Sequence, residues 1–227
     1  MSKIVDLPKP EVVIFDWDNT LVDTWPTIHD ALAKTFGAMG REVWTMEQVK
    51  ERVRKSMRDS FPEIFGDNWR EAADLYQSNY RAIHLERLSA LPEALSVVKK
   101  VKDMGLYSVV VSNKKGDNLR KEVEHIGWNH LFDKVVGATD ANRDKPFIDP
   151  VELALAGSGF SPASGVWFVG DSEIDLECAQ NTGCTAILYG DDAAAHPEYS
   201  ATHYRGFPYH AHVQNHNRTL ELLSGFI

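Results

Sequence analysis

Five short runs of mostly apolar residues recur along this sequence, and none of them alternates regularly between apolar and polar residues. Strands that are covered on both faces have this pattern, which is typical of parallel sheets. Helical patterns separate the runs, and Gly105, Gly127 and Gly183 stand where helices would end. This alternation predicts an α/β fold with a doubly wound parallel sheet. The expected strands are Glu11–Phe15, Leu106–Val111, Lys134–Gly137, Val166–Val169 and Thr185–Leu188.

One segment, from about Thr24 to Leu88, breaks the alternation. It contains no convincing strand, and an all-helical block between the first strand and the next strand–helix unit indicates an inserted cap. The expected helices are roughly Trp25–Met39, Met46–Met57 and Asp67–Leu88. We therefore expect a Rossmann-like core domain made of residues 1–22 and 90–227 and an all-helical cap domain made of residues 23–89.

The charge balance restricts the partners of this chain. It has 33 acidic and 24 basic residues, a net charge of −9, which disfavours nonspecific binding to nucleic acid. No apolar run approaches the ~20 residues that span a bilayer, and Met1–Glu11 has no apolar stretch like that of a signal peptide. The two cysteines suit a reducing compartment. We expect a cytoplasmic protein with no nucleic-acid or membrane partner.

Polar side chains gather where the predicted strands end. The carboxyl ends of parallel strands meet at one edge of a sheet, so these side chains are expected to share a crevice. They are Asp16 and Asp18 after the first strand, Ser112, Asn113 and Lys114 after the second, Lys145 in the loop before a later helix, and Asp171 and Asp175 after the fourth strand.

This set of groups suits phosphoryl transfer. Four carboxylates in one crevice would repel one another and raise one another's pKa values unless a hard cation joined them. Oxygen ligands with room for water and a phosphate suit Mg²⁺. One carboxylate could then attack phosphorus and form an aspartyl-phosphate, while Ser112 and Lys145 would supply a donor and positive charge to the equatorial oxygens.

Four segments resemble the motifs of the haloacid dehalogenase superfamily, in the order and at the positions typical of that family. The helical insert resembles a type-1 cap, and the whole is most similar to the phosphoglycolate phosphatase branch. The resemblance implies an Mg²⁺-dependent phosphoric monoester hydrolase that acts on a small phosphorylated metabolite. The segments are Phe15-Asp-Trp-Asp-Asn-Thr-Leu-Val-Asp23, Val110-Val-Ser112-Asn-Lys114, Lys145-Pro146-Phe-Ile-Asp149-Pro150 and Val169-Gly-Asp171-Ser-Glu-Ile-Asp175.

The same resemblance implies roles for the four carboxylates. Asp16 would be the nucleophile and a Mg²⁺ ligand. Asp18 would be the general acid/base and would lend its backbone carbonyl to the metal. Asp171 would bind Mg²⁺ directly, and Asp175 would act around the metal through water. The dehalogenases of the superfamily lack a carboxylate at the position of Asp18, so Asp18 favours phosphate chemistry.

The resemblance also implies a phosphate-binding set. Ser112, Asn113 and Lys145 would bind the transferring phosphoryl group, and Thr20 would brace the loop after the first strand. Two of the site residues have structural explanations as well. Asp175 would cap its own helix, and Ser112 would satisfy the backbone of its loop. Lys114 would either add to the positive pocket or point to solvent.

Two further groups of residues suggest sites, but structural explanations are favoured for both. The basic residues of the cap would form a solvated helix face in preference to a site for an acidic substrate. The histidines of the tail 196–216 would belong to an exposed polar loop in preference to a metal site. These two groups contain Arg52, Arg54, Lys55 and Arg58 in the cap and His210, His212 and His216 in the tail.

The motifs leave two other functions open. A phosphomutase similar to β-phosphoglucomutase would share every core motif and would differ in the cap. A noncatalytic phosphate-sensing module could use the same fold, although such a module has no need for the acid/base Asp18. The sequence indicates neither the particular substrate nor the oligomeric state.

Overall fold

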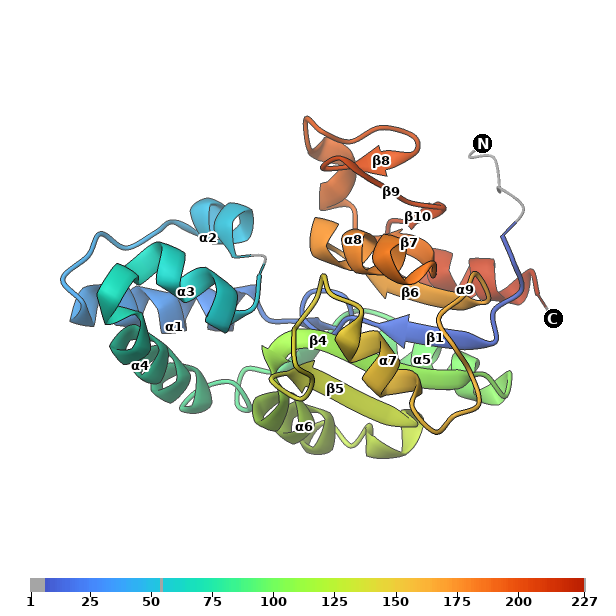
Figure 1. Ribbon diagram of the computed structural model, residues 1–227, viewed down its shortest axis with the longest axis horizontal. Coiled ribbons are helices and arrows are strands. Elements are labelled where there is room, and N and C mark those ends of the chain that lie inside the picture. The colour runs from blue at the N-terminus through green and yellow to red at the C-terminus, as the bar shows by residue number, and fades with distance from the viewer. Residues whose placement is uncertain (1–6, 54, 227) are drawn as a thin grey trace.

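The computed structural model describes residues 7–53 and 55–226 of the chain (Figure 1). Its centre is a six-stranded sheet in the order β10-β7-β6-β1-β4-β5, in which every neighbouring pair is parallel. This arrangement confirms the predicted doubly wound α/β fold. The strands are β1 (Val12–Phe15), β4 (Tyr107–Lys115), β5 (Lys134–Ala138), β6 (Val166–Gly170), β7 (Thr185–Tyr189) and β10 (Ala211–Val213).

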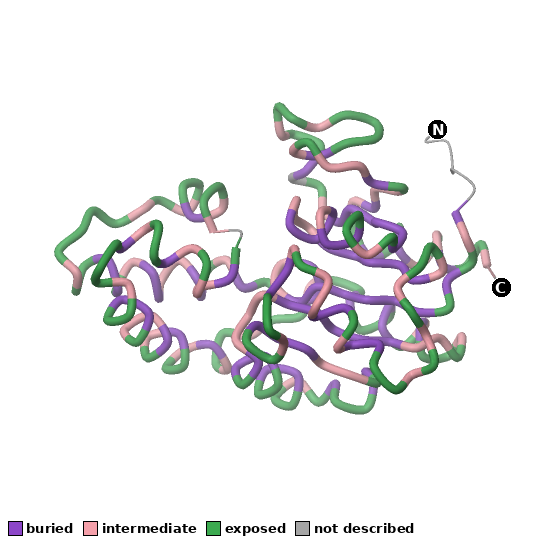
Figure 2. Tube along the Cα trace, viewed as in Figure 1, coloured by how far each residue is buried: buried purple, intermediate pink, exposed green. Residues whose placement is uncertain are grey.

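Helices cover both faces of this sheet, which explains why its strands are continuously apolar. Val13 and Phe15 of β1 belong to one apolar cluster, and Val12 and Ile14 belong to the cluster on the opposite face. All four residues of β1 are buried, and Figure 2 shows the middle of the sheet mostly as buried. The helices of the first face are α5 (Ala94–Asp103), α6 (Gly116–His125) and α9 (His216–Ser224), and those of the second are α7 (Asp149–Leu155) and α8 (Glu173–Thr182).

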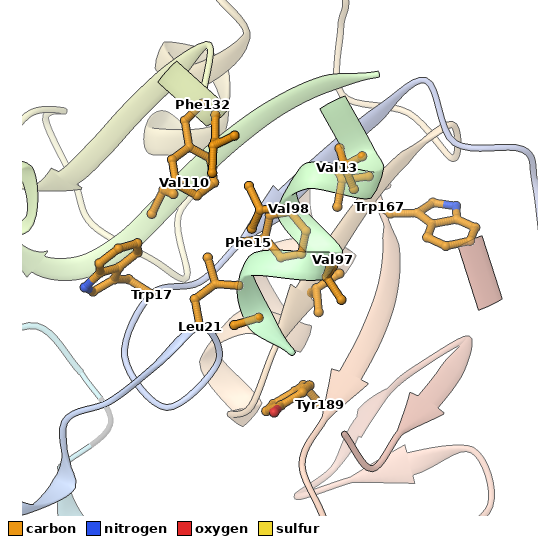
Figure 3. Close-up of a cluster of buried hydrophobic side chains, with 14 of the residues drawn as sticks. Val13, Phe15, Trp17, Leu21, Val97, Val98, Val110, Phe132, Trp167 and Tyr189 are labelled. Atoms are coloured by element: carbon orange, nitrogen blue, oxygen red, sulfur yellow. The ribbon is translucent and has the colours of Figure 1, made fainter. Parts of the chain in front are cut away.

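The cluster on the first face surrounds the loop that follows β1. Figure 3 shows Val97 and Val98 of α5 beside Phe15, with Trp17 and Leu21 at the end nearer the loop. Trp17 is fully buried, and its ring packs edge-on against Trp128 at 6.0 Å between ring centroids. The residue between the two motif carboxylates therefore anchors their loop in the core.

The inserted helices form a separate layer beside the sheet (Figure 1). They pack around their own apolar cluster, in which Phe36 and Phe65 stack at 5.3 Å between centroids. The helices are α1 (Trp25–Ala38), α2 (Met46–Arg52), α3 (Met57–Phe65) and α4 (Trp69–Arg81), with the 3₁₀ turn η1 (Gly66–Asn68) before α4. The antiparallel pair β2 (Val22–Asp23) and β3 (Ser89–Ala90) joins the insert to the core. The domain boundaries themselves stay a prediction.

Two expected cap helices are shorter in the structure. The helix expected over Met46–Met57 ends at Arg52, because Val53 takes an extended conformation, and a new helix starts at Met57. The helix expected to reach Leu88 ends at Arg81.

The tail 196–216 is predicted to be an exposed polar loop, and this prediction is wrong in part. It contains the hairpin β8 (His203–Tyr204) and β9 (Phe207–Pro208) and the edge strand β10. Short 3₁₀ turns lie at η2 (Asn129–Leu131) and η3 (Asp192–Ala195). Within the described ranges, no helix is both long enough and apolar enough to cross a bilayer.

Candidate active site

Three carboxylates converge at the carboxyl edge of the sheet. Asp16 follows β1, Asp171 follows β6, and Asp175 lies in the first turn of α8. One oxygen from each lies within 4.8 Å of the others. The Nζ of Lys145 lies 2.7 Å from an oxygen of Asp16 and 2.7 Å from an oxygen of Asp175. The structure therefore brings together four residues that are up to 159 positions apart in the sequence.

Local geometry fixes the position of Asp175. Its Oδ2 accepts hydrogen bonds from the backbone N–H and the hydroxyl of Ser172, at 3.1 and 2.7 Å, so it caps α8 as the sequence suggested. Its other oxygen faces Lys145. A side chain at Gly170 would place its Cβ 2.3 Å from the Asp175 carboxyl carbon, so only glycine fits there. Asp175 thus serves the helix and the cluster at once.

Burial and charge act against each other in this cluster. Burial, together with the nearby carboxylates of Asp175 and Asp18, raises the pKa of Asp16 to about 7, although the charge of Lys145 opposes this change. Burial alone would lower the pKa of Lys145, but the attraction of Asp16 and Asp175 outweighs burial and raises it. Burial thus dominates the change in the pKa of Asp16, and the attraction of the two carboxylates dominates that of Lys145.

The donor set fits a hard divalent cation. Three convergent carboxylates supply oxygen ligands, which Mg²⁺ prefers, and Asp16, Asp171 and Asp175 are the residues that would hold it. The side chain of Asp18 turns elsewhere, because its Oδ1 lies 2.6 Å from the Nζ of Lys114. The expectation that Asp18 contributes its backbone carbonyl stays a prediction.

The residues expected to bind phosphate line the same cavity, whose volume is about 220 Å³. Ser112 is buried, and its hydroxyl accepts a hydrogen bond from the backbone N–H of Lys114 at 3.2 Å. Both ends of the Asn113 amide are bonded to the backbone of Lys145, each at 3.0 Å. Asn113 therefore holds Lys145 in place with its side chain. The binding of phosphate by Asn113 stays a prediction. Thr20 donates to Asp171 at 3.3 Å.

Sequence reasoning missed a buried network beside Asp18. Glu122 of α6 is fully buried and accepts hydrogen bonds from Trp17 at 2.7 Å, Tyr80 at 2.9 Å and Lys114 at 2.5 Å. The Nδ1 of His84 lies 2.7 Å from the same carboxylate. Lys114 thus points inward and bridges Glu122 to Asp18, so the alternative that it points to solvent is wrong. No local pattern marks Glu122, since it lies in an ordinary amphipathic helix.

A second missed residue, Asp144, contacts the cap. Its Oδ1 accepts a hydrogen bond from the backbone N–H of Thr139 at 2.9 Å, and its Oδ2 lies 2.7 Å from the Nε of Arg58. Arg58 also lines the cavity. The prediction of a solvated surface is therefore wrong for Arg58, whose charge is paired with a buried carboxylate of the core. Arg54 lies outside the described residues.

The hairpin of the tail also contacts the cap. Arg205 lies at its turn with φ 48° and donates to both carboxylate oxygens of Glu51 in α2, at 3.0 and 2.5 Å. The tail and the inserted helices are thereby joined by an ion pair between residues 154 positions apart.

The histidines of the tail have structural partners. The Nδ1 of His210 accepts a hydrogen bond from the backbone N–H of Ala186 at 3.0 Å, and His212 contacts the hydroxyl of Tyr199 at 2.9 Å. His216 is fully buried, so the prediction of an exposed loop is wrong there. Among the residues that the structure describes, the group able to hold a metal is the aspartate cluster.

The fold and the cluster agree with comparisons to known proteins. The family model described as haloacid dehalogenase-like hydrolase matches residues 13–189. The chain is 27% identical over 178 residues to a phosphoglycolate phosphatase of Aquifex aeolicus, an alignment that covers 78% of this chain and 83% of that protein. It is 24% identical over 178 residues to the pyrophosphatase PpaX of Halalkalibacterium halodurans, covering 78% of this chain and 82% of that protein.

Solved structures show the same fold. A haloacid dehalogenase-like hydrolase from Bacteroides fragilis superimposes with a TM-score of 0.81 at 20% identity, covering 91% of this chain and 98% of that one. A haloacid dehalogenase-like family protein from Streptococcus pneumoniae gives 0.76 at 19% identity, covering 96% and 99%. The chain belongs to the haloacid dehalogenase-like hydrolase family. The predictions of this family and of an enzyme of its phosphatase type are confirmed.

Proposed function

We propose that this hydrolase is an Mg²⁺-dependent phosphomonoesterase that acts on a small phosphorylated metabolite through an aspartyl-phosphate. The observation that carries the proposal is the contact of Lys145 Nζ with Asp16 and Asp175, at 2.7 Å each, within a cluster that also contains Asp171. A nucleophilic carboxylate, a buried cation beside it and oxygen ligands for a metal are the parts that phosphoryl transfer needs. The names of the relatives, phosphoglycolate phosphatase and pyrophosphatase, support phosphate chemistry.

Asp16, Asp18 and Lys145 have separate roles in the proposed reaction. A carboxylate oxygen of Asp16 attacks phosphorus, the bond from phosphorus to the ester oxygen breaks, and Asp18 donates a proton to the leaving alkoxide. In the second step Asp18 takes a proton from water as the water oxygen attacks phosphorus, which releases phosphate and restores Asp16. Lys145 keeps Asp16 oriented and offsets charge on the phosphoryl oxygens. A bound Mg²⁺ would neutralise the carboxylates and the phosphate, so that the two anions can approach.

Other residues of the site hold Asp18 and Lys145 in position. Lys114 fixes the side chain of Asp18 through the contact at 2.6 Å, and Asn113 fixes the backbone of Lys145. Ser112 lines the cavity, where its hydroxyl would donate to a phosphoryl oxygen. Asp18 and Lys145 are thus held in position by residues that take no part in the proposed bond changes. Such preorganisation of the reacting groups favours catalysis.

The test is a panel of phosphate monoesters, phosphoglycolate included, assayed for release of inorganic phosphate. We expect turnover with Mg²⁺, none after chelation, and recovery when Mg²⁺ is restored. Asp16→Asn should abolish release, whereas Asp23→Asn, which changes an exposed aspartate of β2, should not. Mg²⁺ should also raise the thermal unfolding midpoint of the parent more than that of Asp171→Asn. Undiminished turnover in excess chelator would refute the proposal.

The same panel separates the two alternative functions. A phosphomutase would convert a sugar phosphate into its isomer without releasing phosphate, and a phosphate-sensing module would bind without turnover. A cytoplasmic location and the absence of a nucleic-acid partner stay predictions from charge and cysteine content.

A further inference from the structure

The cavity above the aspartate cluster has two chemically different walls. The core wall carries the charged and polar groups of the proposed reaction. The cap wall is largely apolar and aromatic. Its members include Trp25, Ile28, Met57, Phe61, Ile64 and Tyr76. A phosphate placed on the core wall would therefore direct the rest of its ester towards apolar side chains.

The cap wall is held in place by contacts among its own rings. Phe61 packs edge-on against Tyr76 at 5.4 Å between centroids, and Tyr76 lies 5.8 Å from Tyr80. Tyr80 is anchored in turn by its hydrogen bond to Glu122. Burial raises the pKa of the Tyr76 phenol, and Asp18 and Glu122 raise it further, so this ring stays neutral. The apolar surface is therefore preformed by packing among these rings.

The polar side chains of the cap wall already have partners. Lys55 lies 3.1 Å from Glu63, and Arg58 lies 2.7 Å from Asp144. The Oε1 of Gln77 accepts a hydrogen bond from Asn118 at 2.9 Å. A carboxylate on the body of the ester, in addition to the phosphate, would lose its hydration against the apolar surface. To reach Lys55 or Arg58 it would have to compete with the acidic partners that these residues already have. Within the described residues, the cap wall thus offers no unmatched positive charge.

One guanidinium nitrogen and one lysine of the cavity are unmatched among the described residues: the Nη2 of Arg58 lacks a hydrogen-bond acceptor, and Lys115 lacks an acidic partner. The Nη2 of Arg58 is buried and has no hydrogen-bond partner within the described part of the chain, although the charge of its guanidinium is matched by Asp144. One neutral acceptor, such as a hydroxyl or carbonyl oxygen, would satisfy it. Lys115, at the end of β4 on the core wall, has no acidic partner among the described residues. Lys115 belongs to the core wall, so among the described residues the cap wall still offers no unmatched positive charge to the body of the ester.

We infer that the substrates are phosphate monoesters of small apolar alcohols, with a branched alkyl or single-ring body and at most one neutral acceptor, and not esters with a second acidic group such as phosphoglycolate. The inference rests on the proposed phosphatase function and specifies its substrate class. The volume of about 220 Å³ limits the body to a small group, since it lies below the range of ~300–1,000 Å³ typical of drug-sized sites.

The first experiment compares primary alkyl esters, so that the leaving oxygen stays similar. With Mg²⁺ present, kcat/KM is measured for ethyl phosphate, 3-methylbutyl phosphate, 2-phenylethyl phosphate and phosphoglycolate. Burial of a ring or branched chain on the cap wall should raise kcat/KM at least about tenfold above that of ethyl phosphate. Phosphoglycolate should not exceed ethyl phosphate.

The second experiment changes the charge of the cap wall at Met57, which is half-buried and close in length to lysine. Met57→Lys should lower kcat/KM for 2-phenylethyl phosphate and raise it for phosphoglycolate, so that the ratio of the two changes at least about tenfold. Met57→Leu is the matched control, because it keeps the wall apolar and should preserve the preference. Equal thermal midpoints of the two variants would show that both fold.

The results distinguish failure of the inference about the substrate class from failure of the proposed phosphatase function. If phosphoglycolate is the best of the four esters, or if ethyl and 2-phenylethyl phosphate are hydrolysed equally, the inference about the substrate class is wrong while the phosphatase function stands. If no ester releases phosphate, and p-nitrophenyl phosphate with its good leaving group does not either, the proposed function fails and the inference fails with it.

Discussion

Replacing Glu122 with glutamine tests the buried network beside Asp18. The side chain of Glu122 is fully buried and contacts Trp17, Tyr80, His84 and Lys114. Burial alone would raise the pKa of this carboxyl, but Lys114 and the hydrogen bonds from its neighbours outweigh burial and lower the pKa from 4.5 to about 2. Glutamine keeps the shape of the side chain, removes its charge and turns an N–H₂ group towards two of the donors.

The magnitude follows from this pKa difference. Between 4.5 in the unfolded chain and about 2 in the folded protein, ionised Glu122 contributes about 3 kcal/mol of stability at neutral pH. Glu122→Gln also leaves buried donors without an acceptor, so we expect a total loss of about 3–5 kcal/mol. The contribution of ionised Glu122 is present above pH 4.5 and disappears as the pH falls towards 2. The loss should therefore be smaller near pH 3 than at pH 7.

The assay is urea unfolding of the parent and the variant at both pH values. Glu124→Gln is the matched control, because Glu124 lies two positions along the same helix and is exposed. Its effect should stay within about 0.5 kcal/mol. A loss below about 1 kcal/mol for Glu122→Gln, or one that does not change with pH, would refute the argument that this ionised carboxylate stabilises the fold.

Three further predictions concern other contacts. Burial lowers the pKa of His216 to about 4, so stability should fall as the pH drops from 6.5 towards 4, by about 3 kcal/mol, and His216→Phe should remove this slope in urea unfolding. Arg205→Met and Glu51→Gln should each raise KM, because they remove an ion pair between the tail and the cap, and the double variant should resemble either single one. Asp18→Asn should accumulate a phosphoenzyme of added mass with an aryl phosphate but hardly react with alkyl phosphates, because an aryl oxide leaves without a proton.

A different result would contradict each of these three predictions. A stability slope between pH 6.5 and 4 that survives His216→Phe would assign that slope to other groups. Additive effects of the two ion-pair variants on KM would mean that the two residues act independently. Turnover of alkyl phosphates by Asp18→Asn at nearly the parent rate would contradict the acid/base role.

The strands of the core were predictable because their signal is local. A strand covered on both faces must be apolar at successive positions, and Val12–Phe15 is buried throughout. The edge strand Ala211–Val213 escaped prediction because it has three residues, one of them histidine, and becomes a strand only by pairing with β7. The break after Arg52 was missed for a similar reason, since an apolar face continues through Val53 in the sequence.

The candidate active site shows the same difference between local sequence signals and tertiary contacts. The fold class was predictable from the sequence, and so was the convergence of the motif residues, because each motif places its residues at the end of a strand and parallel strand ends meet at one edge. Which groups pair across the chain becomes visible only in the folded protein. The contacts of Glu122 with Lys114, Asp144 with Arg58 and Glu51 with Arg205 join separate elements. Each depends on the distance and burial of two side chains, which no pattern along a single segment records.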